Sequence, residues 1–167
     1  VISYNTLLQI LHDPAYLSLG TIDKVIAKAI NRKALKVGAY EYKGYARCFD
    51  SFNHFVDYSF EVYKKEVADQ IFNKDWPIYT HTHNTPPAIY GIHSDIKNSF
   101  VSNGANIDGL VENCVISRNV KIGKGAVVKN SIILSDTFID DGAHIENAVI
   151  DKYCHITSKV RIEGKDS

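Results

Sequence analysis

The chain has 167 residues, of which 45% are hydrophobic, and its 19 basic and 19 acidic side chains give a net charge of zero. This length suits one large or two small domains with a buried core. The balanced charge gives no electrostatic reason to expect nucleic acid or an anionic membrane as a partner. No apolar run approaches the roughly 20 residues of a membrane span.

Three cysteines stand at unrelated spacings, at Cys48, Cys114 and Cys154. An odd number without a pattern gives no disulfide framework, and no signal peptide opens the chain. We therefore expect a reduced, cytoplasmic protein. Because the chain begins at Val1 and contains no Met, we also expect it to be a fragment of a longer protein.

Residues 5–35 are predicted to be helical. Asn5 is expected to cap a first helix that ends at Asp13-Pro14, because proline forbids its continuation. Thr21 is expected to cap a second helix, whose apolar side chains recur at the spacing of one helix face. These side chains are Ile22, Val25, Ile26, Ala29 and Ile30.

Residues 37–48 favour a β-hairpin around the turn Lys43-Gly44. A third helix is predicted from Ser51 to about Phe72, before Trp76-Pro77 ends the helical region. Its apolar stripe, which we expect to serve packing rather than ligand binding, consists of Phe52, Phe55, Val56, Phe60, Tyr63, Val67 and Ile71.

Residues 77–93 are predicted to be an extended connector, because Pro86-Pro87 fixes an extended backbone. His81 and His83 project from one side of such a strand and could bind a metal ion. No third ligand follows at a motif spacing, so we expect a linker strand instead.

Residues 96–162 carry a regular ladder of Ile and Val. Its steps settle into a 6, 6, 5 pattern, which makes a period of 17 residues, and a small or short side chain stands two positions before each step. Such a pair points to one face of a strand. Three short strands would close one triangular coil, and the next coil would stack on it 17 residues later, as in a parallel β-helix. The ladder runs through Ile96, Val101, Ile107, Val111, Ile116, Ile122, Val128, Ile133, Ile139, Ile145, Ile150, Ile156 and Ile162. The alternative, a β-sandwich with evenly spaced strands, would not keep a fixed 17-residue phase.

A second ladder supports the same register. Asn98, Asn113, Asn130 and Asn147 recur at spacings of 15, 17 and 17 residues. Asn tolerates the left-handed backbone of a tight corner, so the four should stack along one edge. The preceding residues alternate in charge as Lys97, Glu112, Lys129 and Glu146. Other corners are expected at Gly104, Gly109, Gly123, Gly125 and Gly142.

The order of these parts resembles the ADP-glucose pyrophosphorylase (glucose-1-phosphate adenylyltransferase) family, above all its second, regulatory-type bacterial subunit. The resemblance covers roughly residues 36–162. Its motifs are the segment Tyr-Ala-Arg-Cys-Phe-Asp-Ser, Trp-Pro-Ile-Tyr-Thr, Pro-Pro-Ala, and hexads such as Gly-Lys-Gly-Ala-Val-Val-Lys-Asn-Ser.

This resemblance implies a mainly β fold. It places a left-handed parallel β-helix of hexapeptide repeats at residues 94–167. The end of an α/β nucleotidyltransferase domain would occupy residues 1–76, and residues 77–93 would be the linker.

The resemblance also implies a reaction, in which ATP and glucose 1-phosphate give ADP-glucose and pyrophosphate for glycogen synthesis. The family pattern Trp-Arg-Asp-Val-Gly-Thr aligns with residues 46–51, and its Asp helps to hold Mg²⁺. Here Arg47 is kept, Cys48 replaces that Asp, and Asp50 replaces the Gly. We therefore expect no intact catalytic, cofactor or metal site in this chain. The alternative is that Asp50, two residues after Cys48, serves as the metal ligand instead. Mg²⁺ and ATP are expected only for the whole family enzyme.

Three functions remain open. The favoured one is a catalytically weakened subunit that assembles through its β-helix with a catalytic subunit or with itself, and responds to small-molecule substrates or effectors. A hexapeptide-repeat acyltransferase is the second, with His144 or His155 as its base. The third is a related sugar-phosphate nucleotidyltransferase of other specificity.

Overall fold

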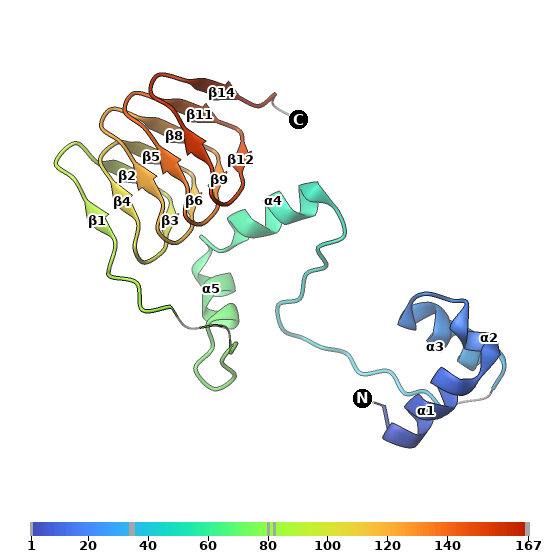
Figure 1. The fold of residues 1–167 in the computed structure, drawn as a ribbon. Helices are drawn as coiled ribbons and strands as arrows, with labels where there is room; N and C mark the ends of the chain where they lie inside the picture. The colour runs from blue at the N-terminus through green and yellow to red at the C-terminus, as the bar shows by residue number, and fades with distance from the viewer. Residues whose placement is uncertain (1, 34–35, 80, 82, 166–167) are drawn as a thin grey trace. The chain divides into compact units, whose positions relative to one another are not determined.

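The computed structural model describes the chain except for residues 1, 34–35, 80, 82 and 166–167 (Figure 1). Its compact units are Val1–Lys43 and Gly44–Ser167. Among the described residues, no helix is long and apolar enough to cross a membrane.

The first unit consists of α1 (Tyr4–His12), α2 (Pro14–Leu17) and α3 (Ile22–Asn31). Its small core contains Ile10, Tyr16, Val25 and Ala29. The predicted helices are confirmed, but the capping residue of α1 is Ser3 rather than Asn5. The Ser3 hydroxyl accepts a hydrogen bond from the Thr6 amide at 3.2 Å, which places the helix start two residues earlier.

The predicted hairpin is wrong. Residues 37–48 are all described, and they form no strand. Residues 37–43 are exposed along their whole length, and no neighbouring strand among the described residues pairs with them. A two-stranded hairpin without further packing is only marginally stable in water, so the alternating pattern alone does not make one.

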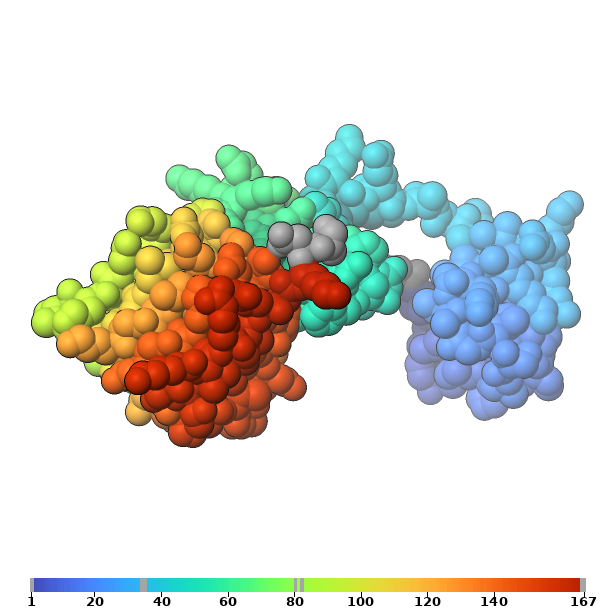
Figure 2. All heavy atoms as spheres, turned by 90° about the horizontal axis from the view of Figure 1, so that it is seen from above, coloured from blue at the N-terminus to red at the C-terminus, as the bar shows by residue number. Residues whose placement is uncertain are grey.

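The predicted third helix is two helices, α4 (Phe52–Glu61) and α5 (Lys65–Ile71). Ser51 caps α4 as its hydroxyl accepts from the His54 amide at 3.1 Å. Residues 62–64 interrupt the helix, and Lys64 has an extended backbone. Both segments lie against the β-helix (Figures 1 and 2), and the Phe72 ring after α5 stacks on Phe100 with centroids 6.3 Å apart.

The rest of the second unit is a parallel β-helix with three sheets. The first sheet contains β1 (Ile89–Tyr90), β4 (Asn106–Ile107), β7 (Lys121–Ile122), β10 (Phe138–Ile139) and β13 (His155–Ile156). The second contains β2 (Asp95–Lys97), β5 (Leu110–Glu112), β8 (Val127–Lys129), β11 (His144–Glu146) and β14 (Arg161–Glu163). The third contains β3 (Phe100–Val101), β6 (Val115–Ile116), β9 (Ile132–Ile133) and β12 (Val149–Ile150).

The register confirms the predicted β-helix. Ile122 pairs with Ile139, and Ile139 pairs with Ile156, one period of the ladder apart each time. The inward residues are fully buried in the middle coils, where Ile116, Ile133 and Ile145 each have no exposed surface. Those of the outermost coils are only partly buried, so both ends of the core are open. They are Ile96, Val101, Ile156 and Ile162.

The corners are left-handed, as the Asn ladder predicts. Asn98, Asn113, Asn130 and Asn147 have φ values of 43°, 52°, 46° and 50°. A second corner repeats through Gly104, Asn119, Asp136 and Tyr153, and a third through Gly125, Gly142 and Lys159, all with positive φ. Gly109 and Gly123 are not among the positive-φ residues. At Gly109 the reason for glycine is space, because a Cβ there would stand 2.5 Å from the Ala126 carbonyl oxygen.

The β-helix begins earlier than the sequence suggests. β1 lies within residues 77–93, which were expected to be a linker, and it pairs with β4 through Ile89 and Tyr90. Helices α4 and α5 belong to the same compact unit as the β-helix. The assignment of residues 1–76 to the end of a nucleotidyltransferase domain stays a prediction.

Candidate functional site

Arg47 of the altered family motif joins residues 44–51 to helix α4. Its Nε and Nη2 donate to the two carboxylate oxygens of Glu61 at 2.8 and 3.1 Å. Tyr45 donates its hydroxyl to the same carboxylate at 2.8 Å, and the guanidinium lies over the Tyr45 and Tyr58 rings. Hydrogen bonds from Arg47 and Tyr45 hold the pKa of Glu61 below its usual value. Arg47 therefore has a structural partner here.

The two other motif residues lie at the surface. Cys48 is an exposed free thiol. Asp50 is exposed and forms a hydrogen bond with His54 Nδ1, in the first turn of α4, and this bond lowers the pKa of Asp50. A soft thiol is a poor ligand for Mg²⁺, which prefers hard oxygen ligands. Among the described residues, no metal-ligand group of three includes Cys48 or Asp50. The Cys48 side chain therefore does not fit the Mg²⁺-ligand position that the family pattern gives to Asp.

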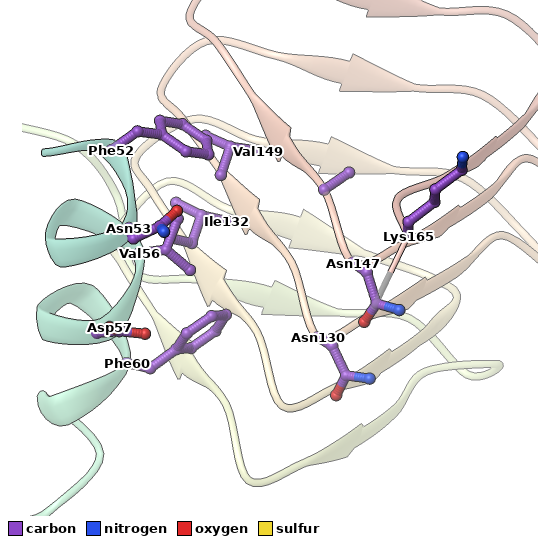
Figure 3. Close-up of a pocket in the computed structure, with 11 residues that line it drawn as sticks. Phe52, Asn53, Val56, Asp57, Phe60, Asn130, Ile132, Asn147, Val149 and Lys165 are labelled. Carbon is purple, nitrogen blue, oxygen red and sulfur yellow. The ribbon is translucent and has the colours of Figure 1, made fainter. Parts of the chain in front are cut away.

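A cavity of about 440 Å³ lies between α4 and strands β9 and β12 (Figure 3). Phe52, Val56 and Phe60 project from α4 toward the strands, and Asn130 and Asn147 stand at the corner of the coils. The apolar side chains of α4 thus face the β-helix, as expected for residues that serve packing. They do not fill the space between the helix and the strands completely, and the cavity is what remains. The remaining lining residues are Asn53, Asp57, Ile132, Ala148, Val149 and Lys165. The cavity offers apolar walls with the amide groups of asparagines, one carboxylate and one lysine, which suits a small ligand with polar substituents.

The four histidines singled out from the sequence do not form one cluster. The His81 and His83 rings are 4.7 Å apart, and neither is in the metal-ligand group found among the described residues. His155 Nε2 lies 3.0 Å from an Asp140 carboxylate oxygen. His144 Nε2 lies 3.3 Å from Glu146 and 3.6 Å from Glu163.

The proximity of Glu163 to His144 is a feature that the sequence analysis missed. The signal was available, because Glu163 follows Glu146 at the 17-residue period and pairs with it in register. The predicted ladder of charged corner residues ends at Glu146, and Glu163 extends it by one period to a position beside His144.

Comparison with known proteins agrees with the architecture. Residues 88–167 match the family model described as GlmU-like, C-terminal hexapeptide. The chain is 41% identical over 108 residues to the glycogen biosynthesis protein GlgD of Bacillus subtilis, which covers 64% of this chain and 32% of that protein. It is 47% identical over 70 residues to GlgD of Geobacillus stearothermophilus, which covers 42% of this chain and 20% of that protein.

A glucose-1-phosphate adenylyltransferase of Thermosipho melanesiensis is also similar. The identity is 31% over 105 residues, which covers 63% of this chain and 25% of that protein. The chain thus spans about a third or less of the length of these relatives. The homologues of this chain thus include proteins named GlgD and glucose-1-phosphate adenylyltransferase, the chain fits an ADP-glucose pyrophosphorylase-like C-terminal portion, and its residues 88–167 match a GlmU-like hexapeptide domain.

Proposed function

We propose that this chain is the C-terminal part of a regulatory-type subunit of glucose-1-phosphate adenylyltransferase. The reaction served is the formation of ADP-glucose and pyrophosphate from ATP and glucose 1-phosphate. The subunit acts mainly through assembly with a catalytic partner, with its β-helix as the contact, and takes part in glycogen synthesis in the cytoplasm. The observation that carries the proposal is the similarity to GlgD together with Cys48 at the position of the metal-binding Asp.

The chemistry of the motif supports a weak catalytic role. Transfer of the nucleotidyl group develops negative charge that a clamped Mg²⁺ stabilises, and removal of one of two carboxylate ligands weakens that clamp. A loss of about 3 kcal/mol in transition-state stabilisation corresponds to roughly two orders of magnitude in rate.

The test restores the motif in the full-length protein by Cys48→Asp combined with Asp50→Gly. Pyrophosphate release from ATP and glucose 1-phosphate is measured with Mg²⁺ varied and no catalytic partner added. We expect the double variant to be at least about tenfold faster than the wild type, and Asp50→Gly alone to bring no gain. Wild-type activity equal to that of a catalytic subunit would contradict the proposal, as would a double variant without any gain.

A second candidate is an acyltransferase, because hexapeptide domains occur in such enzymes and His155 is oriented by Asp140 at 3.0 Å as a general base would be. The names of the relatives favour the adenylyltransferase assignment. Release of free coenzyme A from acetyl-coenzyme A that is lost in His155→Gln would support the acyltransferase instead.

A further inference from the structure

The charge alternation along the Asn corner breaks at the last coil. Lys97 faces Glu112, Glu112 faces Lys129, and Lys129 faces Glu146 across neighbouring strands. Glu146 then faces Glu163. Like charges directly opposite each other destabilise a sheet. The last step therefore places two carboxylates together where the rest of the ladder supplies a cation.

An imidazole completes the group. His144 and Glu146 lie on one face of β11, and Glu163 lies beside them on β14. His144 Nε2 is 3.3 Å from Glu146 Oε2 and 3.6 Å from Glu163 Oε1. The three side chains are 25%, 34% and 43% exposed, so they are half-shielded but reachable from solvent. Ile145, which is fully buried between His144 and Glu146, fixes the direction of both side chains.

These separations match the edge of a metal coordination tetrahedron. Zn²⁺ binds imidazole nitrogen and carboxylate oxygen at about 2.0–2.2 Å, which puts neighbouring ligand atoms roughly 3.3–3.6 Å apart. The ligand atoms of the three residues all lie within 4.8 Å of one another, so small side-chain rotations bring the third edge to the same length. One nitrogen and two carboxylate oxygens also suit zinc better than magnesium or calcium.

We propose that His144, Glu146 and Glu163 form a binding site for a divalent transition-metal ion, with Zn²⁺ as the best match. Three protein ligands leave a fourth position for water or for a ligand from another molecule. The site clamps β14, the last strand of its sheet, to β11. It is separate from the motif at residues 46–51.

Two cations compete with the metal. Arg161, which pairs with His144 in register, forms an ion pair with Glu163, and Lys129 faces Glu146. The Arg161 side chain is 66% exposed and can turn into solvent when a metal takes its place. Arg161 should therefore weaken metal binding, and its removal should strengthen it. An increase in metal affinity on removal of Arg161 would distinguish a metal site from a cluster whose only role is to pair with Arg161.

The experiment is calorimetric titration of the chain with zinc chloride in a non-chelating buffer. The parent chain for this experiment and all variants made from it carry Cys48→Ser, so that the exposed thiol binds no zinc. We expect one zinc ion per chain, with His144→Gln and Glu163→Gln each weakening the affinity at least about tenfold. Arg161→Gln should tighten it. The matched control is His155→Gln, because His155 contacts only the Asp140 carboxylate among the described carboxylates, and its removal should leave the affinity unchanged.

A second measurement keeps the test valid if a variant folds poorly. Zinc should raise the melting temperature of the parent chain and of Arg161→Gln, because a ligand that binds only the folded state stabilises it. It should not raise that of His144→Gln. Zinc binding that is equally strong in His144→Gln, or no zinc binding by the parent chain, would overturn the proposal.

Discussion

The β-helix register makes a sharp prediction for two neighbouring residues of β10. Ile139 points inward and is 2% exposed, whereas Phe138 points outward and is 42% exposed. Ile139 lies between Ile122 and Ile156 in the stack, while Phe138 contacts the His155 ring and the Lys121 ammonium. The same substitution to Asp at the two positions therefore tests the direction of each side chain.

The expected costs differ widely. Ile139→Asp removes a buried aliphatic side chain, worth about 2–5 kcal/mol, and adds an unpaired buried carboxylate that costs several kcal/mol more. Their sum is comparable to the roughly 5–15 kcal/mol that stabilises a whole domain, so the β-helix should not fold. Phe138→Asp loses about 1–2 kcal/mol of half-buried aromatic contact, and Lys121 stands near to pair with the new carboxylate.

The assay is circular dichroism with urea and thermal melting on both variants. We expect Phe138→Asp to keep the native spectrum with a modest loss of stability, and Ile139→Asp to lose the β-helix spectrum. Ile133→Asp, in the middle of the third sheet, should behave as Ile139→Asp does, since Ile133 is also fully buried. If Ile139→Asp keeps a native spectrum and melting temperature, the inward register is wrong.

Three further predictions concern the corner, the thiols and the altered motif. Asn130 has a φ of 46°, so Asn130→Ala should be about 1–2 kcal/mol less stable than Asn130→Gly in urea, and equal midpoints would contradict a left-handed corner. Burial raises the pKa of the Cys114 thiol to about 11, so at pH 8 iodoacetamide should modify exposed Cys48 and leave Cys114 until the chain unfolds, as peptide mass spectrometry would reveal. Because Arg47 holds the pKa of Glu61 below its usual value, their contact contributes fully above the ordinary carboxyl pKa and is lost as the pH falls through the lowered one. Hydrogen exchange of residues 44–51 should therefore approach that of Glu61→Gln as the pH falls, and a constant difference between the two would argue against this contact.

The β-helix was predictable because every coil repeats the same physical requirement. Three features recur with one period: an inward Ile or Val, a small residue two positions before it, and a corner residue that tolerates positive φ. The same pattern in successive coils therefore supports a single register. The register of Ile122 with Ile139 and the left-handed φ of Asn130 follow from this repetition. No such repetition exists before residue 89.

Local patterns failed where packing decides the outcome. The alternation at residues 37–48 resembles a hairpin, yet no sheet lies there to receive it. The apolar stripe from Phe52 to Ile71 fits one helix, but the chain breaks at residues 62–64. Ile89 and Tyr90 look like part of an extended linker, because a strand of two residues is recognised only by its partner β4.

The candidate sites were only partly predictable. The altered motif at Cys48 comes from resemblance, and nothing in its local spacing reveals that Arg47 bonds to Glu61 in α4. The cavity beside α4 depends on how a helix packs on a sheet, which sequence patterns do not specify. The group at His144 follows from the repeat itself, because the period brings Glu163 beside Glu146.

The central claim, that this chain belongs to a subunit that works by assembly, is tested most directly by light scattering. Among the described residues, Val160 is 37% exposed and Ile162 is only partly buried, so the coil that holds them carries exposed apolar side chains of the kind that protein interfaces cover. The full-length protein should be measured alone and mixed with a catalytic glucose-1-phosphate adenylyltransferase from the same organism. We expect an oligomer that contains both proteins, with a mass above that of either monomer. A strictly monomeric protein in the presence of that partner would contradict the account.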